Sequence, residues 1–226
     1  MKGDGIIASC MIDPGHGGKD PGAIGFGVNE KDIALQVSKL VELKLKRSGV
    51  TPYMTRQNDS FVELTERANK ANKLKTDVFV SIHCNSFNSQ AKGIETYAYK
   101  EQFKSLAESV HKELVNSKCY TVNRGVKFAN YSVLRNTKMS ACLVELGFID
   151  NKEDFQILQS KQDELATAIA KGICTHLGVS YNGGSSTNTL YVVATGAYKD
   201  VNNAKKDVEN LKAKGIDAYV HIHKEG

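Results

Sequence analysis

The sequence predicts an α/β fold, with a mostly parallel sheet, helices on both faces, and a small βαβ unit after it. Strand-like and helix-like runs alternate over residues 6–177, and helices between strands favour parallel pairing. The chain has 226 residues, of which 41% are hydrophobic, enough for one ordinary domain and a small appendage. Gly, Ser and Asn dominate residues 180–188, as in flexible linkers. We therefore predict a first domain over residues 1–178, a linker over 179–188 and a C-terminal unit over 189–226.

A glycine-dense loop, residues 13–27, separates the first predicted strand from the first predicted helix. The apolar run at residues 6–12 predicts the strand. Apolar residues recur at helical spacing over residues 30–47 and predict the helix. Asn29 offers its N-cap, and Gly49 suits the left-handed position that ends a helix.

A second strand, over residues 50–56, precedes a second helix. Ser60 and Glu63 form a Ser-x-x-Glu pattern, which predicts a capping box at the start of that helix. Its apolar residues recur at helical spacing: Leu64, Ala68, Ala71 and Leu74. The apolar residues 78–82 then predict a buried strand that ends at His83.

The third part of the first domain repeats this alternation. Residues 93–99 predict a strand, and the run after residue 140 predicts a last strand that ends at Glu145. The helix between them carries one apolar face: Phe103, Leu106, Ala107, Val110 and Leu114. One helical region from about residue 151 to residue 177 closes the domain at Gly178. Beyond the linker, residues 190–194 and 217–222 predict strands on either side of a helix that starts near Val201.

Charge and cysteine content exclude several classes of protein. The formal charge of +5 is dispersed, without the basic block that nucleic-acid binding requires. The five cysteines form no Cys-x-x-Cys pair, which argues against a disulfide framework or a thiolate metal site. We expect Cys10, Cys84 and Cys142 to be packing residues. No apolar run has the roughly 18 to 20 residues of a membrane span, and no secretory leader is evident.

Four residues predict the functional site: His16, Glu30, His83 and Glu145. His16 and His83 follow predicted strands, Glu145 lies in a third, and open α/β sheets bind ligands beyond their strand ends. Glu30 opens a predicted helix, from which it can point back toward the strands. Three nitrogen or oxygen ligands with one position left for water are the arrangement of a catalytic zinc site.

Each of the four has an ordinary alternative explanation. His16 can be a turn histidine, His83 a satisfied strand-end histidine, and Glu30 a carboxylate that favours a helix N-terminus. Glu145 is harder to explain, because burying its charge costs several kcal/mol unless a metal, water or cation compensates. The glycine loop completes neither a dinucleotide-binding nor a phosphate-binding pattern, and the chain has no His-Glu-x-x-His helix.

Four motifs resemble the zinc-dependent N-acetylmuramoyl-L-alanine amidases, which are cell-wall hydrolases of bacteria and phages. The motifs occur in the family's order over residues 6–177: Asp13-Pro-Gly-His-Gly-Gly, Asn29-Glu-Lys, Ser81-Ile-His-Cys-Asn-Ser, and Leu134-Arg-Asn-Thr leading to Val144-Glu-Leu-Gly-Phe-Ile. The resemblance implies the zinc exopeptidase-like form of the α/β fold. It makes His16, Glu30 and His83 the zinc ligands and Glu145 the catalytic carboxylate. Ser140 departs from the family, whose members often have proline there.

The resemblance also implies a mechanism and two candidate substrate-binding residues. The metal polarises the amide carbonyl and activates water, while Glu145 accepts the water proton and passes it to the leaving L-alanine nitrogen. Asn85 lies in the third motif. Arg135 can contact a substrate carboxylate or oxyanion, or it can be an exposed structural arginine.

The C-terminal unit resembles half of a SPOR module, which binds peptidoglycan. A lone βαβ unit of fewer than ~40 residues buries little surface and leaves sheet edges open to pairing. We therefore predict a homodimer in which two units form one module; the alternative is a unit that packs against its own catalytic domain or is frayed. We expect synthesis in the cytoplasm and action on the wall after release.

Two other functions stay open from the sequence. The same zinc fold supports carboxypeptidases that act on wall peptides, and a non-catalytic wall-binding protein can retain a metal site. Glu145 argues against the second, because a binding protein does not require it. Neither the chemotype of the wall nor a phage or host role follows from the sequence.

Overall fold

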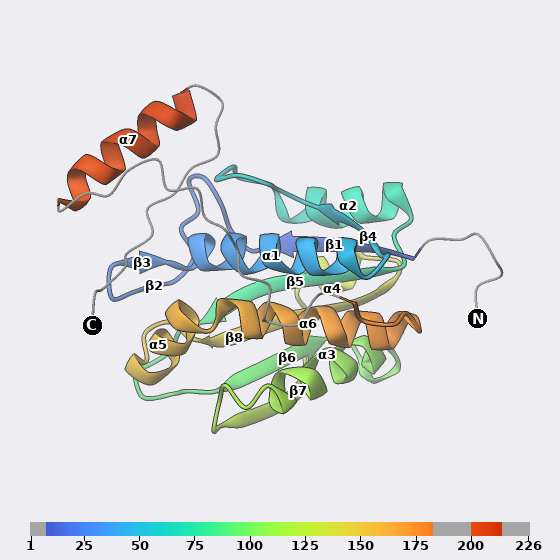
Figure 1. Ribbon diagram of the computed structural model, residues 1–226. Coiled ribbons are helices and arrows are strands. Elements are labelled where there is room, and N and C mark those ends of the chain that lie inside the picture. Colours follow the sequence, from blue (N-terminus) through green and yellow to red (C-terminus); the bar gives the residue numbers. More distant parts are fainter. Residues whose placement is uncertain (1–7, 183–199, 214–226) are drawn as a thin grey trace. The chain divides into compact units, whose positions relative to one another are not determined.

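The structure is a computed structural model that describes residues 8–182 and 200–213 (Figure 1). The chain divides into two compact units, Met1–Ser185 and Ser186–Gly226. The predicted linker boundaries remain a prediction, because residues 183–199 lie outside the described part of the chain.

A six-stranded sheet forms the centre of the first unit, in the order β4-β1-β5-β8-β6-β7. The strands are β1 (Ser9–Pro14), β4 (Thr51–Met54), β5 (Val78–Asn85), β6 (Ile94–Ala98), β7 (Asn123–Phe128) and β8 (Ser140–Phe148). Every neighbouring pair is parallel except β6 and β8, which are antiparallel. A separate two-stranded hairpin pairs β2 (Ile24–Gly25) with β3 (Val28–Asn29). The predicted mostly parallel sheet is confirmed.

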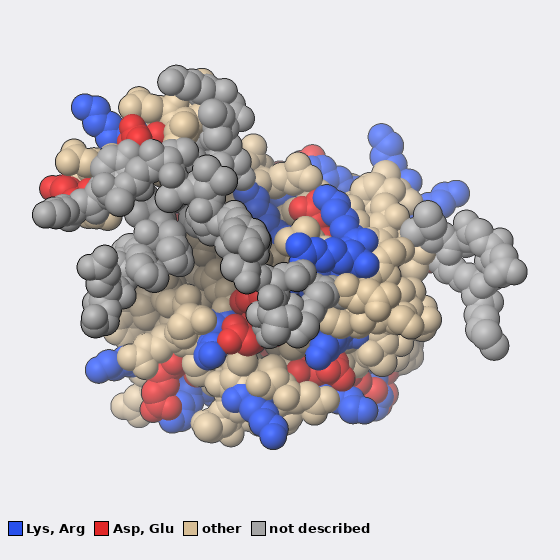
Figure 2. Space-filling model, in the orientation of Figure 1, with Lys and Arg blue, Asp and Glu red and all other residues tan. Residues whose placement is uncertain are grey.

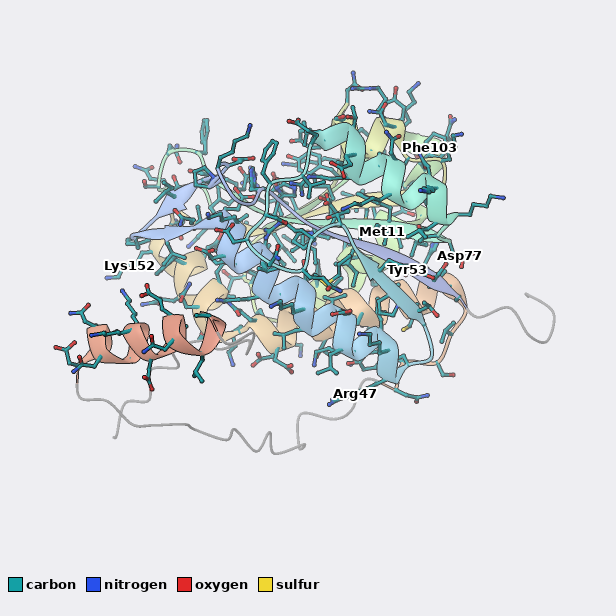
Figure 3. All side chains as sticks on the ribbon, turned by 90° about the horizontal axis from the view of Figure 1, so that it is seen from above. Met11, Arg47, Tyr53, Asp77, Phe103 and Lys152 are labelled. Atoms are coloured by element: carbon teal, nitrogen blue, oxygen red, sulfur yellow. The ribbon has the colours of Figure 1, made fainter. Side chains whose placement is uncertain are left out.

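Helices cover both faces of this sheet. The larger apolar core joins the sheet to α1 (Glu30–Arg47), α3 (Ser105–Asn116), α5 (Lys152–Ser160) and α6 (Gln162–Leu177). A smaller core on the other face joins it to α2 (Leu64–Leu74) and α4 (Ser132–Asn136). Figure 3 shows the sheet from above, with α2 on one side and α1 on the other. A short 3-10 helix, Glu101–Phe103, precedes α3.

Helix α1 forms as predicted and buries one apolar face. Ile33, Val37 and Leu45 are at most 1% exposed, which agrees with their helical spacing on one face of the helix. Asn29 occupies the N-cap position without a side-chain capping bond, and Gly49 adopts a left-handed φ of 77° just after the helix. The helix therefore places Glu30 in its first turn, beside the carboxyl ends of the strands.

The predicted capping box at Ser60 is wrong. Helix α2 begins at Leu64, Glu63 is its N-cap residue, and no side chain caps it. The preceding segment instead packs against the glycine loop: Asp59 accepts hydrogen bonds from Gly18 N at 2.7 Å and Lys31 Nζ at 2.7 Å. These tertiary contacts override the local capping pattern.

Other predicted boundaries also differ from the structure. Strand β8 continues three residues past Glu145 to Phe148, since its pairing with β5 extends to Asn85 through an irregularity in register. The predicted single helix after residue 150 is two helices, because Lys161 leaves the helical conformation. Phe103 lies outside α3 and is 43% exposed. Strand β7, helix α4 and the β2–β3 hairpin were not predicted.

The remaining predictions concern cysteines, charge and the second unit. Cys10, Cys84 and Cys142 are buried packing residues, as expected. Figure 2 shows Lys and Arg interspersed with Asp and Glu on the face that carries α1 and α6. In the second unit, α7 (Val201–Ala213) confirms the predicted helix, whereas the two predicted strands lie outside the described residues. No helix of the described residues is long and apolar enough to cross a membrane.

Candidate metal and catalytic site

The carboxyl edge of the sheet brings His16, Glu30 and His83 together. One ligand atom from each lies within 4.8 Å of the other two. Glu30 Oε1 is 3.0 Å from His16 Nε2 and 2.9 Å from His83 Nδ1, and the two nitrogens are 3.2 Å apart. Figure 3 labels one residue near each end of the strands. Asp77, just before β5, marks the amino ends, and Lys152, at the start of α5, marks the carboxyl ends, where the site lies.

The glycine loop is shaped around these three side chains. A Cβ on Gly15 would lie 2.3 Å from the His83 ring, and one on Gly22 would lie 2.6 Å from Glu30 Oε2. Gly22 also has a φ of +66°, a conformation that a side chain disfavours. The glycines therefore permit close approach of the backbone to the candidate metal ligands.

Further contacts orient each of the three side chains. His16 Nδ1 lies 2.9 Å from Asp20 Oδ2, and His83 Nε2 lies 3.1 Å from Ser81 Oγ. When these nitrogens donate, the opposite nitrogen of each ring carries the lone pair that a metal requires. Glu30 accepts backbone hydrogen bonds from Cys84 N and Ala23 N, both at 2.9 Å.

The spacing of the three atoms fits a tetrahedral zinc ion. Zinc bonds of about 2.0 to 2.1 Å place tetrahedral ligand atoms about 3.3 Å apart. The observed separations of 2.9, 3.0 and 3.2 Å are close to that value. Two imidazoles and one carboxylate also form a donor set common in catalytic zinc sites.

The electrostatics of the cluster favour a cation. Burial raises the pKa of Glu30, but its hydrogen bonds with His16 and His83 outweigh this and bring the pKa well below its usual range. Burial lowers the pKa of His16, yet Glu30 and Asp20 raise it to about 9. Burial likewise lowers the pKa of His83, and Glu30 raises it above the ordinary value. In the metal-free protein the site thus keeps Glu30 ionised and favours protonation of the His16 and His83 rings.

Glu145 lies next to this cluster on the neighbouring strand. It pairs with His83 in the β5–β8 register, so one strand spacing of about 4.8 Å separates their backbones. Its Oε2 atom is buried and has no hydrogen-bond partner among the described residues. Burial is the main reason that the pKa of Glu145 rises to about 7, with Glu30 and Glu95 adding to the effect.

Two buried arginines, which the sequence analysis missed, hold the loop that carries His16. Both are at most 3% exposed. Arg67 bonds to Asp13 Oδ1 at 3.0 Å and to His16 O at 2.7 Å, and Arg56 bonds to Gly15 O at 2.7 Å. Both also donate to Pro14 O. The signal in the sequence was Arg67, a charged residue on the buried face of α2.

The two candidate substrate-binding residues lie in different surroundings. Asn85, on β5 with His83, donates from Nδ2 to Glu95 Oε1 at 2.7 Å. Arg135, on α4, donates to Asn130 O at 3.0 Å and to Asn130 Oδ1 at 2.9 Å. These contacts suit the structural alternative for Arg135. A substrate role for either residue stays a prediction.

Comparisons with known proteins agree with this arrangement. The family model for N-acetylmuramoyl-L-alanine amidase matches residues 10–175. The sporulation-specific N-acetylmuramoyl-L-alanine amidase of Bacillus subtilis is 37% identical over 220 residues, covering 95% of this chain and 84% of that protein. The endolysin of Bacillus phage SPP1 is 41% identical over 188 residues, covering 77% of this chain and 68% of that protein.

Solved structures show the same fold. The amidase AmiC2 of Nostoc punctiforme has a TM-score of 0.73 and 40% identity, covering 76% of this chain and 97% of that one. The catalytic domain of CwlV, an amidase from Bacillus (Paenibacillus) polymyxa, has a TM-score of 0.74 and 37% identity, covering 76% of this chain and 99% of that one.

Proposed function

The chain belongs to the N-acetylmuramoyl-L-alanine amidase family, and from that membership we infer that it hydrolyses the amide bond between N-acetylmuramic acid and L-alanine in peptidoglycan. We propose that one zinc ion, held by His16, Glu30 and His83, supports this reaction. The observation that carries the proposal is the convergence of three side chains that could hold a metal ion, beside a carboxylate with one buried, unpaired oxygen.

In the proposed mechanism, Glu145 moves the proton. A zinc ion in this site supplies Lewis acidity that polarises the amide carbonyl and makes water more nucleophilic. The Glu145 carboxylate accepts the proton of the attacking water and then donates it to the leaving L-alanine nitrogen. In the metal-free protein burial raises the pKa of Glu145 to about 7, and a raised pKa helps a carboxyl group return a proton near neutral pH.

Residues around the metal ligands restrict their movement during this cycle. Asp20 and Ser81 hold the two rings in the orientation that binds a metal. Arg67 and Arg56 hold the backbone of residues 14–16. Such outer contacts tune metal affinity by about 10- to 100-fold in other metalloproteins.

The products of wall digestion test the proposal. Purified peptidoglycan treated with the zinc-loaded protein should yield stem peptides with free L-alanine amines and intact glycan chains, as seen by mass spectrometry. Strong chelation with metal excluded should stop the release. A carboxypeptidase would shorten the peptides at their other end, and a wall-binding protein would release no peptide, so either result contradicts the proposal.

We propose a separate role for the C-terminal unit, residues 189–226, in wall binding and homodimer formation. The B. subtilis relative supports this only in that the match covers 95% of the chain, well beyond residue 178. A dimer would hold two catalytic domains on one polymer and raise retention without new contacts at the site. Light scattering should show a dimeric full chain and a monomeric protein that ends at Gly178. A monomeric full chain, or a dimer that survives truncation, contradicts it.

The biological setting can be a phage or a host cell. One relative is named as sporulation-specific and another as an endolysin. Both names fit an enzyme that acts on the wall after release from the cell in which it was made.

A further inference from the structure

A row of polar side chains crosses four neighbouring strands from the candidate metal site. In the order β5-β8-β6-β7, His83 pairs with Glu145, and Glu145 pairs with Glu95. Arg124 of β7 donates from Nε to Glu95 Oε2 at 2.7 Å. Residues directly opposite each other on paired strands share one face of a sheet. The row therefore runs from a metal ligand, past the proposed catalytic carboxylate, to a cation.

Glu95 is a fixed anion at the centre of this row. It is 2% exposed, and four hydrogen bonds reach its carboxylate. Their donors are Asn85 Nδ2 and Tyr97 OH to Oε1, and Arg124 Nε and Lys127 Nζ to Oε2. Burial raises the pKa of Glu95, but the bonds from Lys127, Arg124 and Tyr97 outweigh this and lower it. Glu95 is thus held as a carboxylate.

The two cations around Glu95 exceed what one carboxylate requires. Arg124 and Lys127 carry two positive charges and both bond to the same oxygen of Glu95, so one positive charge is in excess among these three hydrogen-bonded side chains. Their side chains are 34% and 37% exposed, whereas that of Glu95 is 2% exposed. The excess charge therefore lies on the solvent side of the row, where a ligand can reach it.

Arg124 has an outer edge ready for an anion. Among the described residues, its side chain donates one hydrogen bond, through Nε. Its guanidinium carbon also lies over the Phe148 ring, 5.0 Å from the ring centre, in a cation–π contact. The remaining N–H groups of a planar guanidinium match the two oxygens of a carboxylate.

The distance to the scissile amide suggests which part of the substrate carries that carboxylate. Two strand spacings, about 10 Å, separate the strand of Glu145 from that of Arg124. An extended peptide covers about 3.3 Å per residue, so this span corresponds to two or three residues. The rings of Tyr97 and Tyr131, 5.3 Å apart in an edge-on contact, give this region an aromatic surface.

On the basis of the proposed amidase function, we propose that Arg124 and Lys127, positioned by Glu95, form a subsite for a free carboxylate of the substrate peptide. The carboxylate lies two or three residues beyond the alanine whose amide bond is cleaved. The subsite favours acidic peptides over peptides in which the same groups are amidated.

Two synthetic substrates test the subsite in the zinc-loaded full chain. They are muramoyl peptides that differ only in whether the carboxyl groups beyond the alanine are free or converted to carboxamides. Wild type should cleave the free form with a kcat/KM about 10- to 100-fold higher, since a hydrogen bond to a charged group contributes about 1.5 to 3 kcal/mol. Arg124→Gln should raise KM for the free form more than KM for the carboxamide form, so that the ratio of the two kcat/KM values falls toward one.

Lys127→Gln provides a second measurement and Lys161→Gln a matched control. Lys127→Gln keeps Arg124 on Glu95 and should lose part of the preference. Lys161 is a half-exposed surface lysine paired with Glu164, and its variant should behave as wild type. Equal cleavage of both substrates by wild type overturns the proposal. So does a folded variant at either position that retains the full preference, or that lowers kcat equally on both substrates. Failure of wild type to release either peptide overturns the amidase function together with the subsite.

Discussion

The proposed site has a strand-borne half and a loop-borne half, which the protein holds in place by different means. His83 and Glu145 lie side by side on β5 and β8, where the backbone ladder fixes their spacing. His16 lies in the glycine loop and Glu30 in the first turn of α1, beyond the ladder. Side chains, above all Arg56, Arg67 and Asp20, hold the loop that carries His16, and backbone N–H groups of Ala23 and Cys84 hold the Glu30 carboxylate.

This difference has a consequence for mutation. Backbone hydrogen bonds between strands tolerate most side-chain changes nearby, whereas a loop held by a few buried side chains depends on each of them. The loop-borne half should therefore be sensitive to substitutions that touch neither metal nor substrate.

The largest effect is expected where the two halves act together. His16→Ala and His83→Ala each remove one of the three proposed metal ligands, so both should lose zinc and wall-lytic activity to background. Metal analysis of the purified variants and a turbidity assay on cell walls measure this. A difference between the two variants would break the comparison, because it would mean that one half binds the metal without the other.

Arg67→Met tests whether the loop-borne half depends on a buried side chain that is not itself a proposed metal ligand. It removes the buried partner of Asp13 and the hydrogen bond to His16 O. Removal of one partner from a buried ion pair costs about 3 to 5 kcal/mol. We expect about 3 kcal/mol, because Thr55 and Ser81 still donate to Asp13. Zinc affinity should fall as well.

Denaturant unfolding and zinc titration test this variant, with Arg47→Met as the control. Arg47 is exposed in the last turn of α1, so its substitution should change stability by less than about 0.5 kcal/mol. A loss of under about 1 kcal/mol in Arg67→Met, with unchanged zinc affinity, would contradict a loop that depends on this arginine.

The stability of the metal-free protein should change with pH in several windows, and His16 and Glu145 define one window for each half. The pKa of His16 is raised from 6.5 to about 9. Its contribution to stability is complete below pH 6.5 and is lost as pH rises to about 9. The pKa of Glu145 is raised from 4.5 to about 7. Its contribution is complete below pH 4.5 and is lost as pH rises to about 7.

Unfolding free energies measured against pH in the presence of a chelator separate these windows. Each should span on the order of 2 kcal/mol, less than the full shift because the groups interact. His16→Ala should flatten the alkaline window, and Glu145→Gln the acidic one. If both variants flatten the same window, the two groups titrate as one unit and the division into halves fails for ionisation.

The smallest effect concerns two helix starts. Asn151 Oδ1 accepts from Glu153 N and Asp154 N at the start of α5, so Asn151→Ala should cost about 1 kcal/mol. Ser60→Ala should cost nearly nothing, because α2 begins four residues later without a side-chain cap. Thermal unfolding of both variants checks this. Equal losses of stability in the two variants would indicate that Ser60 does cap α2, which contradicts the structure.

The sequence predicted the parts of the molecule that local patterns determine. The bounds of α1 follow from apolar spacing, and its left-handed end from Gly49. The convergence of His16, Glu30 and His83 followed from strand ends that meet at one edge of the sheet. Glu145 was predicted to need compensation for burial, and its unpaired oxygen agrees with that.

The sequence did not predict the features that depend on tertiary contacts. The start of α2 depends on how residues 57–63 pack against Gly17 and Gly18. Strand β7 carries only two apolar side chains, Val126 and Phe128, and its Arg124 and Lys127 bond to Glu95 from the edge of the sheet. The roles of Arg56 and Arg67 depend on backbone carbonyls far away in the chain, which no local pattern encodes.

The zinc content of Glu145→Gln, measured together with its turnover, tests the central claim most directly. Glutamine keeps the size of the side chain but cannot accept the proton, and Glu145 lies outside the group of three proposed metal ligands. The variant should retain one zinc per catalytic domain, while turnover on peptidoglycan falls by about 10² to 10⁴. Loss of zinc from the folded variant would make Glu145 a metal ligand, and undiminished turnover would remove it from the proton transfer; either result contradicts the account.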